Sequence, residues 1–210
     1  MMEKATTQVE SCQRTTLSPI CLLVTPRTLQ FFFVIGTLIL LPAARLHGGL
    51  SIGATYSLGF VDIDGSKHST ADGRVTVVVL TTAADREKAR AVGDRVPEHC
   101  LGNPVYRMIT IIRFARRHTA VGRRIATAFI RHRVNEEAKR LQARYDEKKI
   151  KRDARKDIFV ATDSDGSMSS QLGEPEGGTD FYVFVFGRNG ELIAQWHGVP
   201  SAEQLAVALK

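Results

Sequence analysis

The sequence RVTVVVLTTAADREKARAVGDRVPEHCLGNPVYRMITIIRF, residues 74–114, indicates the fold most directly. Residues 74–80 and 106–114 are nearly unbroken runs of β-branched and other apolar residues, as in strands buried on both faces of a parallel sheet. Between them, residues 83–96 carry Ala, Val and charged residues at helical spacing and stop before Pro97. A strand, a helix and a strand within about 40 residues predict a right-handed βαβ unit.

The C-terminal part of the chain predicts the rest of the same sheet. Residues 157–162 (DIFVAT) are typical of a further buried strand. Residues 181–186 (FYVFVF) and 191–196 (ELIAQW), joined by an Arg-Asn-Gly turn, form the clearest β-hairpin in the chain. Residues 200–209 follow as an amphipathic helix with Pro and Ser near its start. With a β-like run at residues 56–63, these elements predict an α/β fold, a mixed-sheet sandwich.

The N-terminal region has the features of an export signal. Residues 29–41 (LQFFFVIGTLILL) carry no charge, follow Arg14 and Arg27, and precede a proline and small residues. The run is short for a spanning helix, which needs about 20 apolar residues. We therefore expect residues 1–47 to be a signal peptide or a membrane anchor, the alternative being a buried core segment. The protein is then exported, either periplasmic or anchored in the cell envelope, and residues 48–210 form its folded domain.

The positive charge is concentrated in one segment. The 210 residues carry 29 Lys and Arg against 22 Asp and Glu, a net charge of +7. Residues 113–157 alone hold 16 Lys and Arg against 6 Asp and Glu, which is +10, so the rest of the chain stands at −3. The pattern predicts a long basic helical insert at residues 115–157 with one apolar stripe. The stripe consists of Ile125, Phe129, Val134, Ala138, Leu141, Tyr145, Ile150 and Ala154.

Two interpretations of the basic helix stay open. In the first, the stripe lies on the sheet and the charged face is solvated. In the second, the helix contacts an anionic membrane or another envelope polyanion, which gains on the order of 1 kcal/mol per Lys or Arg near the surface. Nucleic acid is the weaker candidate partner, because no known nucleic-acid-binding signature accompanies the charge; a protein partner stays open. The residues expected to contact the polyanion are Arg116, Arg117, Arg123, Arg124, Arg131 and Arg133.

Five stretches, in their order and spacing, resemble the thioredoxin superfamily, in its peroxiredoxin and membrane-tethered thiol-disulfide oxidoreductase branch. They are Tyr56-Ser-Leu58, Asp62-Ile-Asp-Gly65, residues 69–73, the strand at residues 75–80, and FVFGRNGELIAQWHG at residues 184–198. The resemblance implies a thioredoxin-like mixed sheet flanked by helices. It also implies a catalytic cysteine at the mouth of the first helix and a cis-proline in the loop before the hairpin.

Both catalytic features that the resemblance implies are missing. Residues 81–86 (TTAADR), where the cysteine would stand, contain no Cys, and residues 178–180 (GTD), before the hairpin, contain no Pro. A hydroxyl cannot replace a thiolate there without a paired base. We therefore expect a domain without a redox-active CxxC, acting as a non-catalytic binding or scaffold protein. The alternative is an enzyme, a divergent thiol oxidoreductase or peroxidase that uses Cys100.

Cys100 is the candidate nucleophile of that alternative, because the adjacent His99 could lower its pKa. Its position after Pro97, at the far end of the predicted helix, favours a packed cysteine instead. Asp62-Ile-Asp-Gly65 and Asp163-Ser-Asp-Gly166 resemble the middle of calcium loops but lack the terminal ligands, so they predict turns. The six histidines have no metal-site spacing. We expect neither a metal nor a cofactor.

Overall fold

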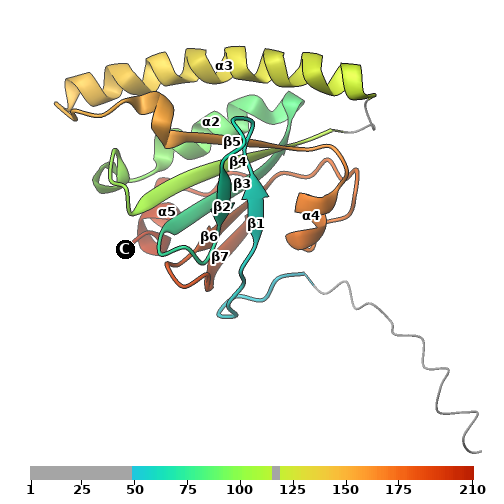
Figure 1. Cartoon of the computed structure of the whole chain (residues 1–210). Coiled ribbons are helices and arrows are strands. Elements are labelled where there is room, and N and C mark those ends of the chain that lie inside the picture. The colour runs from blue at the N-terminus through green and yellow to red at the C-terminus, as the bar shows by residue number, and fades with distance from the viewer. Residues whose placement is uncertain (1–48, 115–118) are drawn as a thin grey trace, which may run out of the picture. The chain divides into compact units, whose positions relative to one another are not determined.

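Figure 1 shows the computed structural model of the chain, which describes residues 49–114 and 119–210. The signal peptide or anchor predicted for residues 1–47 lies outside these ranges. Among the helices described, none is both long and apolar enough to span a lipid bilayer.

A five-stranded mixed sheet forms the centre of the domain, with the strand order β5-β4-β3-β6-β7. Its strands are β3 (Val75–Thr82), β4 (Tyr106–Arg113), β5 (Ile158–Asp163), β6 (Tyr182–Phe186) and β7 (Leu192–His197). The strands β3, β4 and β5 are parallel to one another, whereas β6 is antiparallel to β3 and β7 is antiparallel to β6. The predicted βαβ unit and the predicted hairpin are both confirmed.

Helices and a small hairpin surround this sheet (Figure 1). The helices are α2 (Arg86–Arg95), α3 (Ala120–Glu147), α4 (Ser167–Gln171) and α5 (Ala202–Ala208), with single 3-10 turns at η1 (Ala83–Asp85), η2 (Glu98–Cys100) and η3 (Ala154–Asp157). A separate two-stranded sheet pairs β1 (Gly59–Val61) with β2 (Lys67–Ser69). Helix α5 begins at a capping box, in which Ser201 and Gln204 satisfy each other's backbone N–H groups.

The central strand β3 separates two apolar cores. One face packs with Phe60 of β1 and with Leu172, which follows α4. The other face packs with Val92 of α2 and Leu205 of α5. This burial on both faces explains the unbroken apolar run in the sequence of β3. A mixed five-stranded sheet flanked by helices, with helical crossovers between its parallel strands, is a thioredoxin-like α/β fold.

Helix α3 connects β4 to β5, which are neighbouring parallel strands, so it is the crossover of a second βαβ unit. Its 28 residues span about 42 Å at 1.5 Å per residue. The helix ends at Glu147, and Lys149 then takes a left-handed backbone conformation with φ 58°. The helix therefore covers only part of residues 115–157, and the chain returns to β5 through η3.

The predicted apolar stripe is wrong in the N-terminal half of α3. Val134 and Tyr145 are buried as expected, but Ile125 and Phe129 are 67% and 58% exposed. The reason is the step of five residues from Phe129 to Val134, which rotates the side-chain direction by about 140° at about 100° per residue. Ile130 takes the inward position in this part of the helix and packs beside Val134.

Candidate functional site

The strand β3 ends at Thr82, where the resemblance implies a catalytic cysteine, and η1 then leads into α2. The Thr82 hydroxyl donates a hydrogen bond to Oδ2 of Asp85 at 3.1 Å. The other carboxylate oxygen of Asp85 binds Nζ of Lys88 at 2.8 Å, and this hydrogen bond lowers the pKa of Asp85. A carboxylate held ionised by a lysine is a weak base. It therefore does not activate the Thr82 hydroxyl as a nucleophile.

A buried arginine lies beneath the loop that leads into β6. Arg113 ends β4, is in register with Thr82, and is 3% exposed. Its Nη2 donates to the carbonyl oxygen of Asp180, while Nε and Nη1 have no hydrogen-bond partner within the described ranges. Burial lowers the pKa of Arg113, and the charges of Glu174 and Asp180 oppose that shift. The loop in which the resemblance implies a cis-proline is thus held by a cation.

Cys100, the single cysteine among the described residues, lies in η2 and is 7% exposed. Burial raises the pKa of its thiol to about 11. Only about one thiol in ten thousand is then ionised at pH 7. The ring of His99 is engaged elsewhere, 3.2 Å from the carbonyl oxygen of Leu209 and edge-on to the Tyr106 ring. The surroundings of Cys100 are those of a packed thiol.

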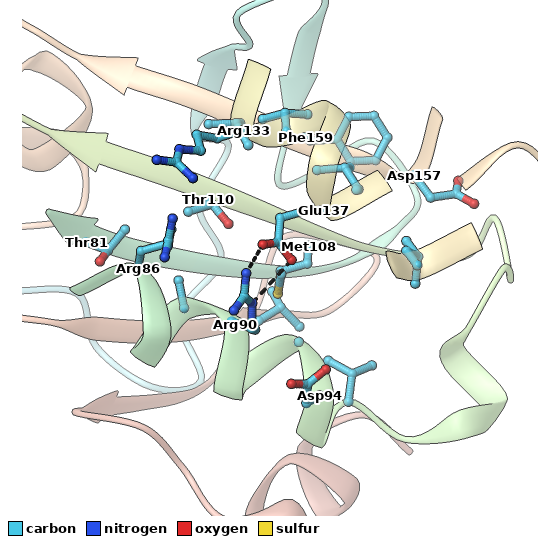
Figure 2. Close-up of a pocket in the computed structure, with 18 of the residues that line it drawn as sticks. Thr81, Arg86, Arg90, Asp94, Met108, Thr110, Arg133, Glu137, Asp157 and Phe159 are labelled. Atoms are coloured by element: carbon cyan, nitrogen blue, oxygen red, sulfur yellow. Dashed lines mark hydrogen bonds and ion pairs between the residues drawn. The ribbon is translucent and has the colours of Figure 1, made fainter. Parts of the chain in front are cut away.

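An open groove of about 630 Å³ lies between α2 and α3, over one face of the sheet (Figure 2). Met108, Thr110 and Ile112 of β4 line it and are only half-buried. Ile109 and Ile111, on the opposite face of the same strand, are completely buried. The two helices thus leave one face of β4 partly uncovered. Sequence reasoning missed this groove, because residues of both faces are mainly apolar and no alternation distinguishes them.

Charged side chains join the two helices across the groove. Arg90 of α2 pairs with Glu137 of α3, as the dashed lines in Figure 2 show. Asp94 of α2 pairs with Arg144 of α3 at 3.4 Å and with Arg140 at 4.0 Å. Ion pairs at a partly exposed surface contribute about 0–1 kcal/mol each. The walls of the groove are therefore connected by interactions that water and salt weaken, above an apolar floor.

The side of α3 that faces away from the sheet carries a second feature, an outer row formed by Val121, Ile125 and Phe129. These side chains are 67%, 67% and 58% exposed. They are spaced four residues apart and, at about 100° per residue, lie roughly opposite the buried Ile130 and Val134. Between Val121 and Phe129, no side chain of α3 is buried. The first turns of α3 thus present apolar groups to the surroundings of the domain.

Two of the arginines predicted to contact a polyanion are free on this part of the helix. Arg123 and Arg124 are exposed and form no ion pair within residues 49–114 and 119–210. Arg116 and Arg117 lie outside the described residues. The charges of Arg123 and Arg124 are therefore available to an external anion.

The other two predicted arginines have partners within the domain. Arg131 donates to the carbonyl oxygen of Ile63 at 2.5 Å and lies 3.7 Å from the carboxylate of Asp64, in the turn between β1 and β2. The guanidinium of Arg133 lies 4.9 Å from the centre of the Phe129 ring. This cation–π contact places a charge directly beside the outer row.

The two acidic turns have structural roles. Oδ1 of Asp62 accepts hydrogen bonds from the backbone N–H groups of Asp64 and Ser66, at 2.9 and 2.8 Å. Asp163 accepts one from the N–H of Ser169 in α4 at 2.8 Å. Both predicted turns are present. In the part of the chain that the structure describes, no group of three or more His, Cys, Asp or Glu side chains could hold a metal ion.

Comparisons with known proteins found similar solved structures but no match by sequence. No family model and no curated protein sequence matches the chain. One similar solved structure is the exposed lipoprotein thioredoxin Etrx1 of Streptococcus pneumoniae strain TIGR4, with 11% identity, a TM-score of 0.47, and coverage of 73% of this chain and 98% of that chain. Another is StoA of Bacillus subtilis, with 13% identity, a TM-score of 0.44, and coverage of 75% and 99%. A third is a putative thiol:disulfide interchange protein DsbE of Chlorobium tepidum, with 14% identity, a TM-score of 0.45, and coverage of 77% and 95%.

Proposed function

We propose that this thioredoxin-like domain is a non-catalytic, exported module that binds anionic lipid surfaces of the cell envelope through α3. The observation that carries the proposal is the outer row of α3, which stands exposed beside unpaired arginines. An apolar stripe flanked by Arg is the pattern of helices that lie in the boundary between lipid headgroups and acyl chains. Export is supported by the uncharged run at residues 29–41, which follows basic residues.

The outer row supplies the hydrophobic part of the binding free energy. Full burial of a Val, Ile or Phe side chain contributes about 1.5–3 kcal/mol. The three side chains are already 33–42% covered, since 58–67% of each is exposed. Their transfer into the lipid boundary therefore gains about 1–2 kcal/mol each, or about 3–6 kcal/mol together.

The charges of the same segment act in the same direction. Residues 119–135 contain four arginines and neither Asp nor Glu. Arg123, Arg124 and Arg133, which lack a carboxylate partner among the described residues, add about 1 kcal/mol each near anionic lipid. With the outer row, the total is about 6–9 kcal/mol, which corresponds to a dissociation constant around the micromolar range before ordering costs.

The non-catalytic part of the proposal is supported by the two candidate nucleophiles. Thr82 is hydrogen-bonded to Asp85, whose pKa is lowered by Lys88, so the residue at the end of β3 has no effective base. Cys100 is buried, and its pKa of about 11 keeps the thiol protonated near neutral pH. A binding role needs neither residue to be reactive.

Co-sedimentation of the full chain with phosphatidylcholine vesicles, with and without phosphatidylglycerol, tests the proposal. We expect the double variant Val121→Ser and Ile125→Ser to bind anionic vesicles at least about 10-fold more weakly than the parent, because both side chains lose their apolar contact. Val207→Ser is the matched control, since Val207 is 68% exposed but lies on α5. Residues 1–47 are the same in the parent and in every variant, so a difference in vesicle affinity between them cannot come from lipid binding by these residues.

A second pair of variants tests the electrostatic part. Arg123→Gln with Arg124→Gln should weaken binding at about 50 mM salt and reduce the further loss on raising salt to about 500 mM, although Arg133 still contributes to that loss. Lys151→Gln with Lys156→Gln removes the same charge from the far end of the basic segment and should have a smaller effect. Equal vesicle binding by the parent and by the double variant of Val121 and Ile125 would refute the proposal. It would also be refuted if the affinity of the parent for anionic vesicles were the same at about 50 and about 500 mM salt.

A further inference from the structure

We infer that the groove between α2 and α3 binds the aliphatic chain of a long-chain fatty acid, with its carboxylate at the end of the groove marked by Arg86 and Arg133. Of the outer row, Phe129 also lines the groove, whereas Val121 and Ile125, the two residues changed in the vesicle experiment, do not. The groove needs no vesicle to be filled, since a fatty acid in solution can reach it.

The floor of the groove is suited to an apolar ligand. Met108 and Ile112 line it as half-buried side chains, although β4 lies next to the central strand of the sheet, and Ile158 of the edge strand β5 lines it beside them. Ala89 of α2 and Val134 of α3 line its walls. Pockets for small ligands are mainly apolar and have volumes of about 300–1,000 Å³, a range that includes the 630 Å³ found in this domain.

The shape of the groove favours a long, thin occupant. Its lining follows β4 from Tyr106 to Ile112, six residue steps, or about 20 Å along the strand. It begins beside Thr81 and Ala84, where β3 leads into α2, and ends beside Tyr145. An extended acyl chain can lie along this path, with the helices α2 and α3 on either side.

The charges at the two ends give the ligand a direction. Figure 2 shows Arg86 of α2 and Arg133 of α3 at the same end as Thr81, with Asp157 at the opposite end. Arg86 is already paired with Glu87 at 2.9 Å. Arg133 forms no ion pair among the described residues, so it is the cation that can bind a carboxylate by a charge-assisted hydrogen bond. Asp157, at the opposite end, is a carboxylate that is already paired with Arg152 at 2.7 Å, and it offers no positive charge to the ligand. The carboxylate is therefore placed beside Arg133 and the methyl end towards Tyr145.

Ligand binding to the full chain can be measured without vesicles by titration with dansyl-undecanoic acid, whose fluorescence rises in an apolar site, and by displacement with palmitate. Ala126→Trp places a large ring into the groove that Ala126 lines. We expect it to weaken probe binding more than 10-fold. Ala143→Trp is the matched control, because Ala143 is exposed on the same helix and does not line the groove; it should bind as the parent does.

The position of the carboxylate is tested separately. Arg133→Gln should weaken binding of palmitate about 5- to 10-fold and leave binding of the uncharged hexadecanol unchanged. Arg123→Gln removes a charge of the same helix that does not line the groove, and should change neither. If Ala126→Trp does not fold, as judged by circular dichroism, Thr110→Leu replaces it, because the larger side chain reduces the volume of the floor.

Probe binding that is unchanged in a folded Ala126→Trp or Thr110→Leu variant would overturn the inference, and so would equal losses for palmitate and hexadecanol in Arg133→Gln. The outcome of the vesicle experiment does not depend on whether the groove binds the probe. A parent that binds the probe but not anionic vesicles contradicts membrane binding and supports the groove. A parent that binds vesicles and no probe contradicts the groove alone.

Discussion

The thiol of Cys100 should react about 100-fold more slowly in the folded protein than in the unfolded chain. Burial raises its pKa from 9.0 to about 11. Each pH unit between the pKa and the ambient pH reduces the thiolate fraction tenfold, so a rise of two units lowers that fraction about 100-fold near neutral pH. Steric exclusion can only add to this factor, because 7% of the residue is exposed.

The assay is alkylation by iodoacetamide, which attacks the thiolate, followed by mass spectrometry. Cys12→Ser and Cys21→Ser remove the other two cysteines of the chain, so that only Cys100 can react. The rate in the folded protein should rise about tenfold per pH unit up to about pH 10, whereas the rate in urea should level off above about pH 9. A folded rate within about tenfold of the unfolded rate would contradict this account and favour the thiol oxidoreductase alternative.

The raised pKa of Cys100 also predicts that the folded protein loses stability at high pH. The pKa of Cys100 is higher in the folded state, so the folded state binds the proton more tightly. The stabilisation is fully present below about pH 9 and is lost as the pH rises towards 11, a total of about 2–3 kcal/mol. Cys100→Ala should lose less of its free energy of unfolding over this range, as measured by urea denaturation.

Three substitutions give further tests by thermal or urea denaturation. Gly93→Ala should stabilise α2 by about 1 kcal/mol, because the added methyl would lie 3.4 Å from Cε of Met108, an ordinary contact. Gly190→Ala should destabilise the domain instead, since Gly190 has φ +83° and a Cβ there would collide with the carbonyl oxygen of Tyr56. Tyr145→Phe should cost about 1–3 kcal/mol, because it removes a 2.9 Å hydrogen bond to Asp157. The parent should also lose more stability than Tyr145→Phe between about pH 10 and 12, because the Tyr145 pKa is raised to about 12 by burial.

The sheet was predictable from the sequence because its signals are local. The strand β3 is an uninterrupted β-branched run, and the hairpin of β6 and β7 is marked by its turn. The inward face of α3 was predictable only where the spacing stays at three or four residues, from Val134 onward. At Ile125 and Phe129 the apolar character of the residues predicted burial, but the sheet does not cover these two side chains and they are exposed.

The groove and the buried cation were not predictable for a different reason. The groove depends on the separation of α2 and α3, whose paired residues Arg90 and Glu137 are 47 positions apart. Arg113 resembles any other charged residue at the end of an apolar strand, and its burial follows from the loop that carries Asp180. Neither feature leaves a periodic pattern in the sequence, because each results from contacts between distant segments.

The order of strands in the sheet has a consequence for how the chain reaches its native state. Thr76 of β3 is paired with Phe186 of β6, which is synthesised 110 residues later. Contacts of such long sequence separation form slowly, because a large loop must close first. Until then β3 can pair with β4 on one side only, and its other edge offers unpaired backbone groups and valines to any neighbouring chain. Chains that stop before residue 181 should therefore aggregate through β3.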